Sequence, residues 1–254
     1  MLGNEFIEDF KASFSPKQQL KDFKSLTKGQ SWLLVIMLLA QFWAFIAGKD
    51  FSGTGWLGIV TGVATVINLV LIDRGFITNY AWGFVSAGAW FAVSLHNWLL
   101  SDIATQGFFF FMQFVGIYMW GAQIRKAQSN AVEAKKLTAK QAALVTLGSL
   151  LLYLVLVYVT THFHGNQALL DASLLPLNII GQMLMSYGYR TQWIAWIAVD
   201  VIAIIIWYNQ TKTLSPASLS MLVLNITMLV NALYGAYLWN RKEGLGNVTN
   251  SEHN

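Results

Sequence analysis

Cysteine is absent from this chain, and charged residues are scarce. Without cysteine, disulfides, thiolate metal ligands and thiol nucleophiles are all excluded. Asp, Glu, Lys and Arg make up 11% of the residues, whereas a typical soluble domain holds about 25%. Hydrophobic residues make up 56%. This balance predicts an integral membrane protein rather than a soluble one. Residues 1–30 are charged and lack the apolar core of a cleavable signal, so the chain is expected to insert through its own spans.

Motifs of known enzyme classes are also missing. The sequence has no Walker loop, no dinucleotide fingerprint and no nucleophile–base pair at a recognisable spacing. His162 and His164 have no carboxylate or thiol beside them, so they are only a weak indication of a metal site. We therefore expect no enzymatic activity, no cofactor, no bound metal and no nucleic-acid partner.

Cations are missing from the interior of the long hydrophobic segments. Phosphate groups are recognised by such cations or by helix N-termini, so a phosphorylated solute is disfavoured. Asp200 is a single carboxylate inside a segment, with no chain of further carboxylates to relay protons. The sequence therefore favours a passive facilitator over a pump.

Eight hydrophobic segments are long enough to cross about 30 Å of hydrocarbon. They are expected at 31–48, 55–73, 79–99, 102–121, 141–161, 169–187, 192–209 and 215–239. The sixth is interrupted by Pro176, Asn178 and Gln182, and such interruptions are tolerated where a span lines a cavity. Residues 1–30 hold four phenylalanines and five lysines. They are either a solvated segment or a helix on the lipid surface.

Basic residues are unevenly divided between the two sides of this arrangement. With a cytoplasmic N-terminus, 14 of the 16 Lys and Arg residues fall inside, and only Lys49 and Lys212 fall outside. Cytoplasmic loops of membrane proteins carry such an excess of basic residues. The predicted topology is therefore eight spans with both termini cytoplasmic, which leaves residues 1–30 and the tail 240–254 inside the cell.

The chain also repeats itself weakly. The sequence GIYMW (116–120) ends the fourth segment, and GAYLW (235–239) ends the eighth. The sequence TNYAWG opens the third segment at Thr78, and TQWIAW opens the seventh at Thr191. Two copies of a three-helix unit would produce this pattern.

The predicted repeats cover residues 55–121 and 169–239. Because three is an odd number, the segment 141–161 between them restores the direction of the chain, so the two repeats are parallel. The segment 31–48 is an addition to this 3+1+3 plan. Transporters built on such repeats bind their solute between the two halves, near the middle of the membrane.

One face of the seventh segment carries the strongest candidate site. Trp193, Trp196 and Asp200 follow the spacing i, i+3, i+7, which places two indoles and a carboxylate on one helix face. A carboxylate in a span costs about 3 kcal/mol on insertion scales and is usually functional. We expect this face to bind a small, ring-bearing solute, and Gly83, which aligns with Trp196 in the first repeat, to leave room for it. The alternatives are that the two tryptophans are interfacial, and that Asp200 is neutralised by a neighbour or caps a kink in the helix.

Four amide side chains are further candidates for the site. Gln106 and Gln113 share one face of the fourth segment, whereas Asn225 and Asn231 lie about 120° apart around the eighth. Each can hydrogen-bond a solute. Each can instead join two helices, a contact worth about 0.6 kcal/mol on average in membranes.

The GxYxW helix ends, the TNYAWG entry and the WIAWIAVD stretch resemble the PnuC family of bacterial vitamin transporters over residues 55–242. The resemblance implies an all-α membrane protein with a SWEET-like 3+1+3 fold, here with one extra N-terminal helix. It also implies facilitated uptake of nicotinamide riboside, a non-phosphorylated NAD precursor, across the bacterial inner membrane. By position, the substrate-binding roles fall on Trp193, Trp196, Asp200, Gln106 and Gln113, with Asn231 near a further amide position.

The resemblance leaves alternatives open. The family also contains thiamine and riboflavin carriers, so another vitamin, or a sugar, is the alternative solute. A different class of protein, a membrane subunit that transports nothing, would bind no solute. The expected partners are nicotinamide riboside, the lipid bilayer and further copies of the chain, in a small homo-oligomer such as a trimer.

Overall fold

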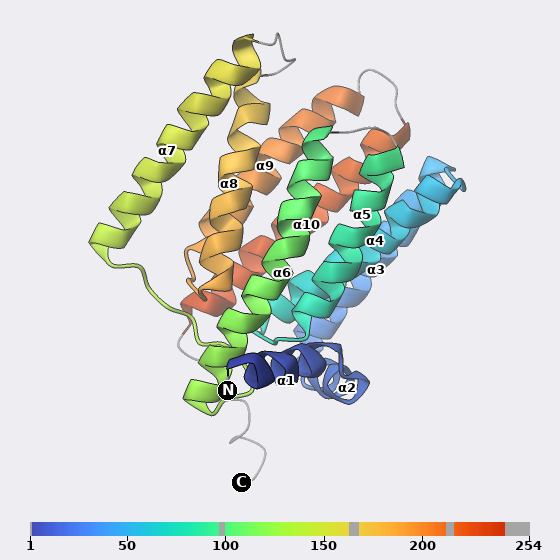
Figure 1. Cartoon of the computed structure of the whole chain (residues 1–254). Helices are drawn as coiled ribbons and strands as arrows, with labels where there is room; N and C mark the ends of the chain where they lie inside the picture. The colour runs from blue at the N-terminus through green and yellow to red at the C-terminus, as the bar shows by residue number, and fades with distance from the viewer. Residues whose placement is uncertain (1, 97–99, 163–167, 212–215, 242–254) are drawn as a thin grey trace.

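Ten α-helices form in the part of the chain that the structure, a computed structural model, describes: residues 2–96, 100–162, 168–211 and 216–241 (Figure 1). They are α1 (Leu2–Phe14), α2 (Pro16–Lys24), α3 (Lys28–Gly48), α4 (Gly53–Asp73), α5 (Asn79–His96), α6 (Leu100–Ala127), α7 (Ala139–His162), α8 (Ala168–Ser186), α9 (Gln192–Thr211) and α10 (Pro216–Asn240). Each of the eight hydrophobic segments corresponds to one of the helices α3 to α10. Residues 242–254, most of the expected tail, lie outside the described residues.

Local sequence signals explain where several helices begin. Thr27 and Gln30 form a capping box at the start of α3, in which the Thr27 N–H donates to Gln30 Oε1 at 2.9 Å. Ser52 caps α4 by accepting a hydrogen bond from the Gly55 N–H at 3.2 Å. Ser15 caps α2, and Pro16 takes the first helical position. Proline is suited to this position because a backbone N–H there would have no partner within the helix.

Six of the helices close into a ring. Each helix packs against the next in the order α4, α5, α6, α8, α9 and α10, and α10 returns to α4. In a ring of this order α5 lies opposite α9, α6 opposite α10 and α4 opposite α8. The helix α7 packs on the outside of α8 and lies at the edge of the bundle (Figure 1).

The additional helix α3 packs on the outside of the ring, against α4 and α10. A polar side chain fixes it there: Gln41 is buried, and its Nε2 donates to Thr227 Oγ1 of α10 at 3.3 Å. The α4 residue opposite is Gly62, where an added Cβ would lie 2.7 Å from Gln41 Oε1. Small residues and interhelical hydrogen bonds are the usual means of helix association in membranes.

Several of the described helices have the length and hydropathy of membrane spans. Six of them, α3, α4, α6, α7, α9 and α10, are long and apolar enough to cross a bilayer. In α8 the stretch Ser173–Ser186 is apolar, and α5 packs between α4 and α6 in the ring. The expectation of an all-α, multi-pass membrane protein is therefore confirmed for the described residues. That α5 and α8 also cross the membrane stays a prediction.

Two corners of the ring are built alike, one between α4 and α5 and one between α8 and α9. Gly75 and Gly188 turn the chain with φ angles of 68° and 75°, a conformation that favours glycine. In both corners the glycine N–H donates to a carbonyl of the preceding helix, Ile72 O at 2.9 Å and Met185 O at 2.8 Å. The glycines align at the same spacing that relates Thr78 to Thr191.

The segment between α6 and α7 joins the two corners. The Val132 N–H donates to Gly75 O at 2.9 Å, and the Lys135 N–H donates to Gly188 O at 2.8 Å. The Arg190 N–H returns a bond to Lys135 O at 3.0 Å. This extended segment therefore holds both corners at one end of the bundle.

Residues 2–24 form a pair of helices, α1 and α2, that packs across one end of the bundle (Figure 1). The Phe10 ring of α1 stacks on Phe114 of α6 at 6.2 Å between centroids and meets Phe84 of α5 edge-on at 6.2 Å. Arg125 near the end of α6 forms ion pairs with Asp9 and with Glu5, the latter at 3.2 Å. The first thirty residues are thus mostly helical and folded against the bundle, and their contact with lipid stays a prediction.

The shorter helix α2 attaches to the first corner through a buried acid. Asp22 Oδ2 accepts a hydrogen bond from Thr78 Oγ1 at 2.6 Å, and Asp22 Oδ1 accepts one from Gln18 Nε2 at 2.7 Å. Burial raises the pKa of Asp22, against the lowering effect of these two hydrogen bonds. A second contact runs from Trp82 Nε1 to Gln19 Oε1, at 3.0 Å.

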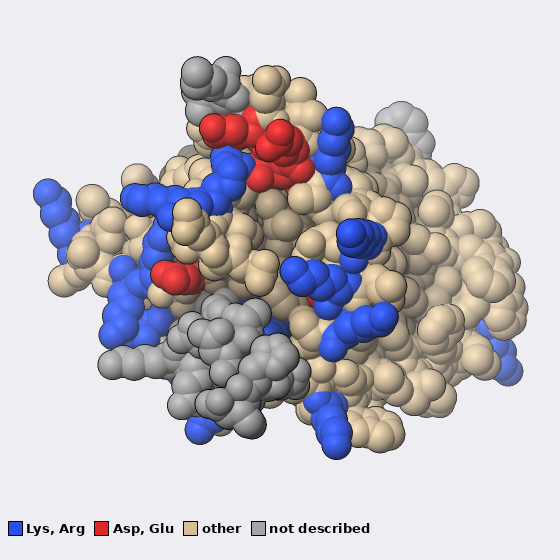
Figure 2. All heavy atoms as spheres, turned by 90° about the horizontal axis from the view of Figure 1, so that it is seen from below, with Lys and Arg blue, Asp and Glu red and all other residues tan. Residues whose placement is uncertain are grey.

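We call the end of the bundle where α4, α6, α8 and α10 finish the basic end. Lys and Arg side chains gather across this face, as Figure 2 shows, while acidic side chains are fewer there. Arg74 follows α4, Lys126 lies in the last turn of α6, and Arg190 and Arg241 follow α8 and α10. Lys49 caps the opposite end of α3. The fold therefore groups on one end the described basic residues that the charge pattern assigned to one side.

Candidate functional site

The α9 face with the two indoles and the carboxylate points into the bundle. Asp200 is 2% exposed and Trp193 is 1% exposed, whereas Ile194 on another face of the helix is 70% exposed. Trp196 is half-buried. The helix rises about 1.5 Å per residue, so Asp200 lies about 10 Å from Trp193 along the axis, away from the basic end. The i, i+3, i+7 spacing therefore marks a face of α9 that points into the bundle, as predicted.

Trp193 is enclosed on all sides at the basic end. Its six-membered ring fills the space beside Gly235 of α10, where an added Cβ would collide with it. Its ring also meets Trp239 at 6.1 Å, nearly perpendicular. The indole Nε1 has no hydrogen-bond partner among the described residues. Both faces of this ring are therefore occupied by protein.

Trp196, one helical turn further into the bundle, is half-buried and packs against α8. Gly181 of α8 lies beside its indole, and an added Cβ there would be 3.0 Å from the ring. The expectation that Gly83 leaves a vacant space opposite Trp196 is wrong. Gln113 of α6 and Asn68 of α4 fill that position, with Asn68 Nδ2 at 3.2 Å from an added Cβ.

Asp200 occupies the deepest of the three positions. It is buried between neighbouring helices, since α9 packs against α8 and α10. No described group forms a hydrogen bond or ion pair with its carboxylate, so the neighbour that was the alternative reading is not found among the described residues. A buried carboxylate without protein partners is a candidate ligand for a cationic solute.

The two glutamines of α6 lie in different surroundings. Gln113 is buried, its Nε2 donates to Phe109 O at 2.9 Å within α6, and its Oε1 has no partner among the described residues. Gln106, two turns away, is half-buried. The exposed face of α6 carries Phe111 and Tyr118, so both glutamines lie off its most exposed side.

The two asparagines of α10 are both buried, but they have different partners. Asn225 Nδ2 donates to Met221 O at 2.8 Å within its own helix. Asn231 Nδ2 donates instead to Asp73 Oδ1 at the end of α4, at 3.2 Å. In the described part of the chain no hydrogen bond joins any two of the seven candidate residues.

Asp73 is the residue that reading the sequence missed. It is the last residue of α4 and has no exposed surface. An acid followed by Arg74 at the end of a span resembles an ordinary pair at the membrane surface. Only the packing of α10 against α4 reveals that the Asp73 carboxylate is buried and bonded to Asn231.

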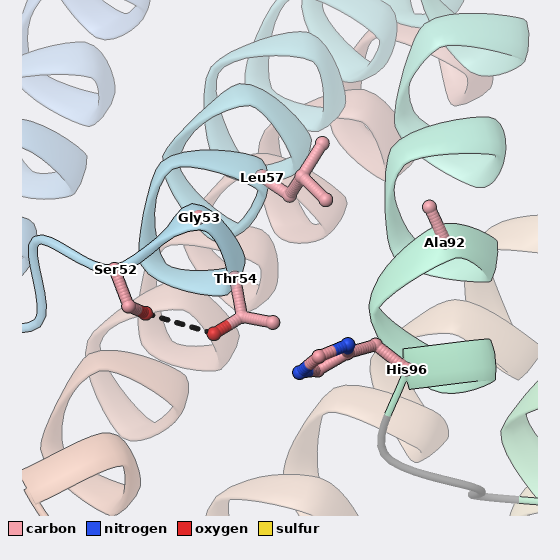
Figure 3. Close-up of a pocket in the computed structure, with 6 residues that line it drawn as sticks. All are labelled: Ser52, Gly53, Thr54, Leu57, Ala92 and His96. Atoms are coloured by element: carbon pink, nitrogen blue, oxygen red, sulfur yellow. Dashed lines mark hydrogen bonds between the residues drawn. The ribbon is translucent and has the colours of Figure 1, made fainter.

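A pocket of about 420 Å³ opens at the end opposite the basic end, between the start of α4 and the end of α5 (Figure 3). It is lined by Ser52, Gly53, Thr54, Leu57, Ala92 and His96. The Ser52 and Thr54 hydroxyls hydrogen-bond one another at 2.8 Å (Figure 3). None of the seven candidate residues lines this pocket, so it is distinct from the candidate site.

Comparison with known proteins identifies the family. The profile of the family described as nicotinamide mononucleotide transporter matches residues 55–241. The chain belongs to this family. The nicotinamide riboside transporter PnuC of Haemophilus influenzae is 28% identical over 214 residues, which cover 82% of this chain and 88% of the relative. The transporter of the same name from Neisseria mucosa is 28% identical over 214 residues, covering 83% and 80%.

A solved structure agrees with these relatives. The crystal structure of the vitamin B3 transporter PnuC matches with a TM-score of 0.73 and 28% identity, over 89% of this chain and 96% of that chain. The resemblance to the PnuC family is therefore confirmed, and the protein is a multi-pass membrane protein of a transporter family. The family match begins at residue 55, after α1, α2 and α3.

Proposed function

We propose that this protein carries nicotinamide riboside into a bacterial cell across the inner membrane, by facilitated diffusion. The observation that carries this proposal is the agreement between the two relatives and the solved transporter. All three match at 28% identity over 80% or more of both chains. No catalytic step is assigned to the chain, in keeping with its transporter family.

The riboside is preferred to the mononucleotide because of where the cations lie. The family description names the mononucleotide, whereas both relatives are named for the riboside. In the described residues of α4 to α10, Lys and Arg occur only near helix ends, as with Arg125 and Lys126 in the last turn of α6. A phosphate midway through the bundle would therefore meet no cation.

The proposed architecture is a pair of parallel three-helix repeats, 55–121 and 169–239, joined by the linker 141–161. Reciprocal hydrogen bonds support this pairing. Trp120 Nε1 at the end of α6 donates to Met185 O of α8 at 2.8 Å, and Trp239 Nε1 at the end of α10 donates to Ile72 O of α4 at 3.3 Å. The last helix of each repeat is thus bonded to an equivalent carbonyl in the first helix of the other.

The glycines of the GxYxW motif support the same pairing. Gly116 of α6 lies against the Tyr80 ring of α5, and Gly235 of α10 lies against the Trp193 ring of α9. At both positions an added Cβ would collide with the ring. In each proposed repeat, the first aromatic residue of the second helix therefore packs against a glycine of the third helix.

Within this architecture we assign the solute to the inner faces of α6, α9 and α10. Trp196 offers a half-buried indole face, and a flat cation over such a face gains about 0.5–2 kcal/mol. The Asp200 carboxyl group, which has no partner among the described residues, becomes the counter-charge of the pyridinium when nicotinamide riboside binds beside it. Gln106, Gln113 and Asn225 supply amides for the carboxamide and the ribose hydroxyls. Trp193 and Asn231 support this face from the basic end, through contacts with protein.

The proposed orientation places the basic end, and both termini, in the cytoplasm. The grouping of Lys and Arg on that face supports this orientation (Figure 2). The helix α7 presents exposed Leu144, Leu147 and Leu151 on its outer side, which suits lipid contact. A small homo-oligomer, such as a trimer, stays a prediction.

Calorimetric titration of the purified protein tests the proposed solute. Nicotinamide riboside should bind, and nicotinamide mononucleotide, thiamine and riboflavin should bind at least ten-fold more weakly. Tighter binding of thiamine or riboflavin would replace the proposed solute by another vitamin. If none of the compounds gives a heat of binding, although the protein melts cooperatively and is therefore folded, a membrane subunit that transports nothing would be favoured.

A further inference from the structure

The end of α4 carries a carboxyl group that is buried at the joint with α10. Asp73 and Asn231 both have no exposed surface. Asn231 Nδ2 donates to Asp73 Oδ1 at 3.2 Å. The other oxygen of each side chain, Asp73 Oδ2 and Asn231 Oδ1, has no partner among the described residues. Buried polar atoms are nearly always hydrogen-bonded, so two such atoms on adjoining side chains need an explanation.

No described Lys or Arg, the neighbouring Arg74 included, forms an ion pair with Asp73. In the described part of the chain, the ion pairs are those of Arg125 with Glu5 and Asp9, at α1. An isolated carboxylate in a protein interior is strongly disfavoured, and such a group takes up a proton instead. The titratable groups that lie near this end in α4 and in the elements packed against α4 and α10 are Arg74, Lys28 of α3, Tyr80 of α5, Arg190 before α9, Tyr234 of α10 and Arg241 after it.

We propose that Asp73 is a proton-binding site, and that the bound proton completes a two-bond carboxylic acid–carboxamide pair with Asn231. The proton sits on Asp73 Oδ2 and is donated to Asn231 Oδ1, while Asn231 Nδ2 continues to donate to Asp73 Oδ1. One proton thus satisfies both unpartnered oxygens, which neither side chain can achieve when Asp73 is ionised.

The pair lies where α4 and α10 are already held together. Trp239 Nε1 of α10 donates to the backbone oxygens of Ile72 and Asp73, at 3.3 and 3.2 Å. Gly235, one turn after Asn231, leaves the space that Asp73 and Trp193 occupy. The acid–amide pair therefore adds a side-chain bond to the backbone bonds that close this joint.

Loss of the proton destabilises the closed joint, because it leaves a charge buried beside the uncharged Trp193 and Asn231. Separation of α4 from α10 would admit water to the carboxylate. If the protein is the carrier proposed above, a proton at the basic end then favours closure of that end. The proton enters and leaves on the same side, so none crosses the membrane and the transport stays passive.

The variant Asp73→Asn tests the proton directly and needs no solute, so its outcome is independent of the proposed function. An amide at position 73 makes both hydrogen bonds with Asn231 without a proton. The wild-type melting temperature should fall as pH rises from about 5 to about 9, because the native state then binds more protons than the unfolded state. In Asp73→Asn part of this fall should disappear, whereas Glu133→Gln, a change at an exposed carboxylate, should keep the wild-type slope.

Infrared spectroscopy provides a second measurement at neutral pH. The wild-type protein should show a protonated carboxyl band that loses intensity in Asp73→Asn, where the other buried acids still contribute, and that keeps its full intensity in Glu133→Gln. If Asp73→Asn does not fold, Asn231→Leu replaces it, since losing the amide partner should shift the same band. The variant that folds is compared with the wild type. If its carboxyl band and the pH dependence of its melting temperature are both unchanged, Asp73 is ionised and the proposal is overturned.

Discussion

At the scale of single residues, the glycine–aromatic contacts explain why the GxYxW pattern occurs twice. Gly116 and Gly235 each admit a large ring from the neighbouring helix, and each motif tryptophan donates its N–H to a helix-end carbonyl. The motif tyrosines, Tyr118 and Tyr237, are exposed. The repeat was visible in the sequence because these contacts restrict residue type at fixed intervals.

The first prediction concerns Gly235. Alanine at this position would place a methyl group against Asp73 and the Trp193 ring, and overpacking of this kind costs about 1–3 kcal/mol. Gly235→Ala should therefore lower the melting temperature in detergent. Gly148→Ala on α7 is the matched control, since nothing lies within 4 Å of the added methyl. Equal melting temperatures in the two variants would contradict the packing described here.

The second prediction concerns Trp196. Stacking and cation–π contact of an indole with a ring are worth about 1–2 kcal/mol, so Trp196→Ala should weaken binding of nicotinamide riboside by about ten-fold. Trp196→Phe should recover part of the loss, because an aromatic face remains. Trp32→Ala, at an exposed tryptophan of α3, should leave the affinity unchanged. Titration calorimetry measures all three. An unchanged affinity in Trp196→Ala would remove this residue from the site.

Residue spacing could find the inward faces, but not the partners across the bundle. Trp193, Asp200 and Gln113 are buried as their periodicity predicted. The Asp73–Asn231 bond joins residues in two distant segments, and no local pattern marks it. The vacancy expected at Gly83 was wrong for the same reason, since the side chain that fills it comes from another helix.

At the scale of elements, the spans were predictable and the N-terminal pair was not. Long apolar runs predicted the helices α3 to α10, and six of these are long and apolar enough to cross a bilayer. The amphipathic pattern of residues 1–30 shows that one face is apolar, but not which surface covers it. The contacts of Phe10 with α5 and α6, and of Asp22 with Thr78, answer that question.

The third prediction tests how α2 is attached. Thr78→Val removes the hydroxyl that donates to Asp22 and leaves that buried carboxyl with Gln18 alone, so α2 should detach more often. Limited proteolysis after Lys17 and Lys21 should become faster. Thr146→Val, at an exposed position on α7, is the control. Identical cleavage rates in the two variants would show that this bond does not hold α2.

The same attachment should depend on pH. Because burial raises the pKa of Asp22, the folded state favours its protonated form. The contribution of Asp22 to stability is therefore complete at low pH and is lost as pH rises through the raised pKa. Cleavage after Lys17 should accelerate over that range in the wild type. A cleavage rate that falls with pH, after correction for the protease, would contradict this sign.

At the scale of the whole molecule, the charge pattern supports the proposed orientation, and the ring of six helices holds the inner faces to which we assign the solute. The chain has no cysteine, so single cysteines can report sidedness without background. In intact cells an impermeant maleimide should label Lys49→Cys and spare Lys136→Cys, which lies in the segment between α6 and α7. Labelling of Lys136→Cys in sealed cells would reverse the proposed orientation.

Uptake by the purified protein in liposomes, without a membrane potential, decides whether the protein is a passive carrier of nicotinamide riboside. Nicotinamide riboside should enter until its concentrations inside and outside are equal, and nicotinamide mononucleotide should enter no faster than into protein-free liposomes. Equal uptake of the two compounds, accumulation of the riboside above its outside concentration, or no uptake of the riboside would contradict the account.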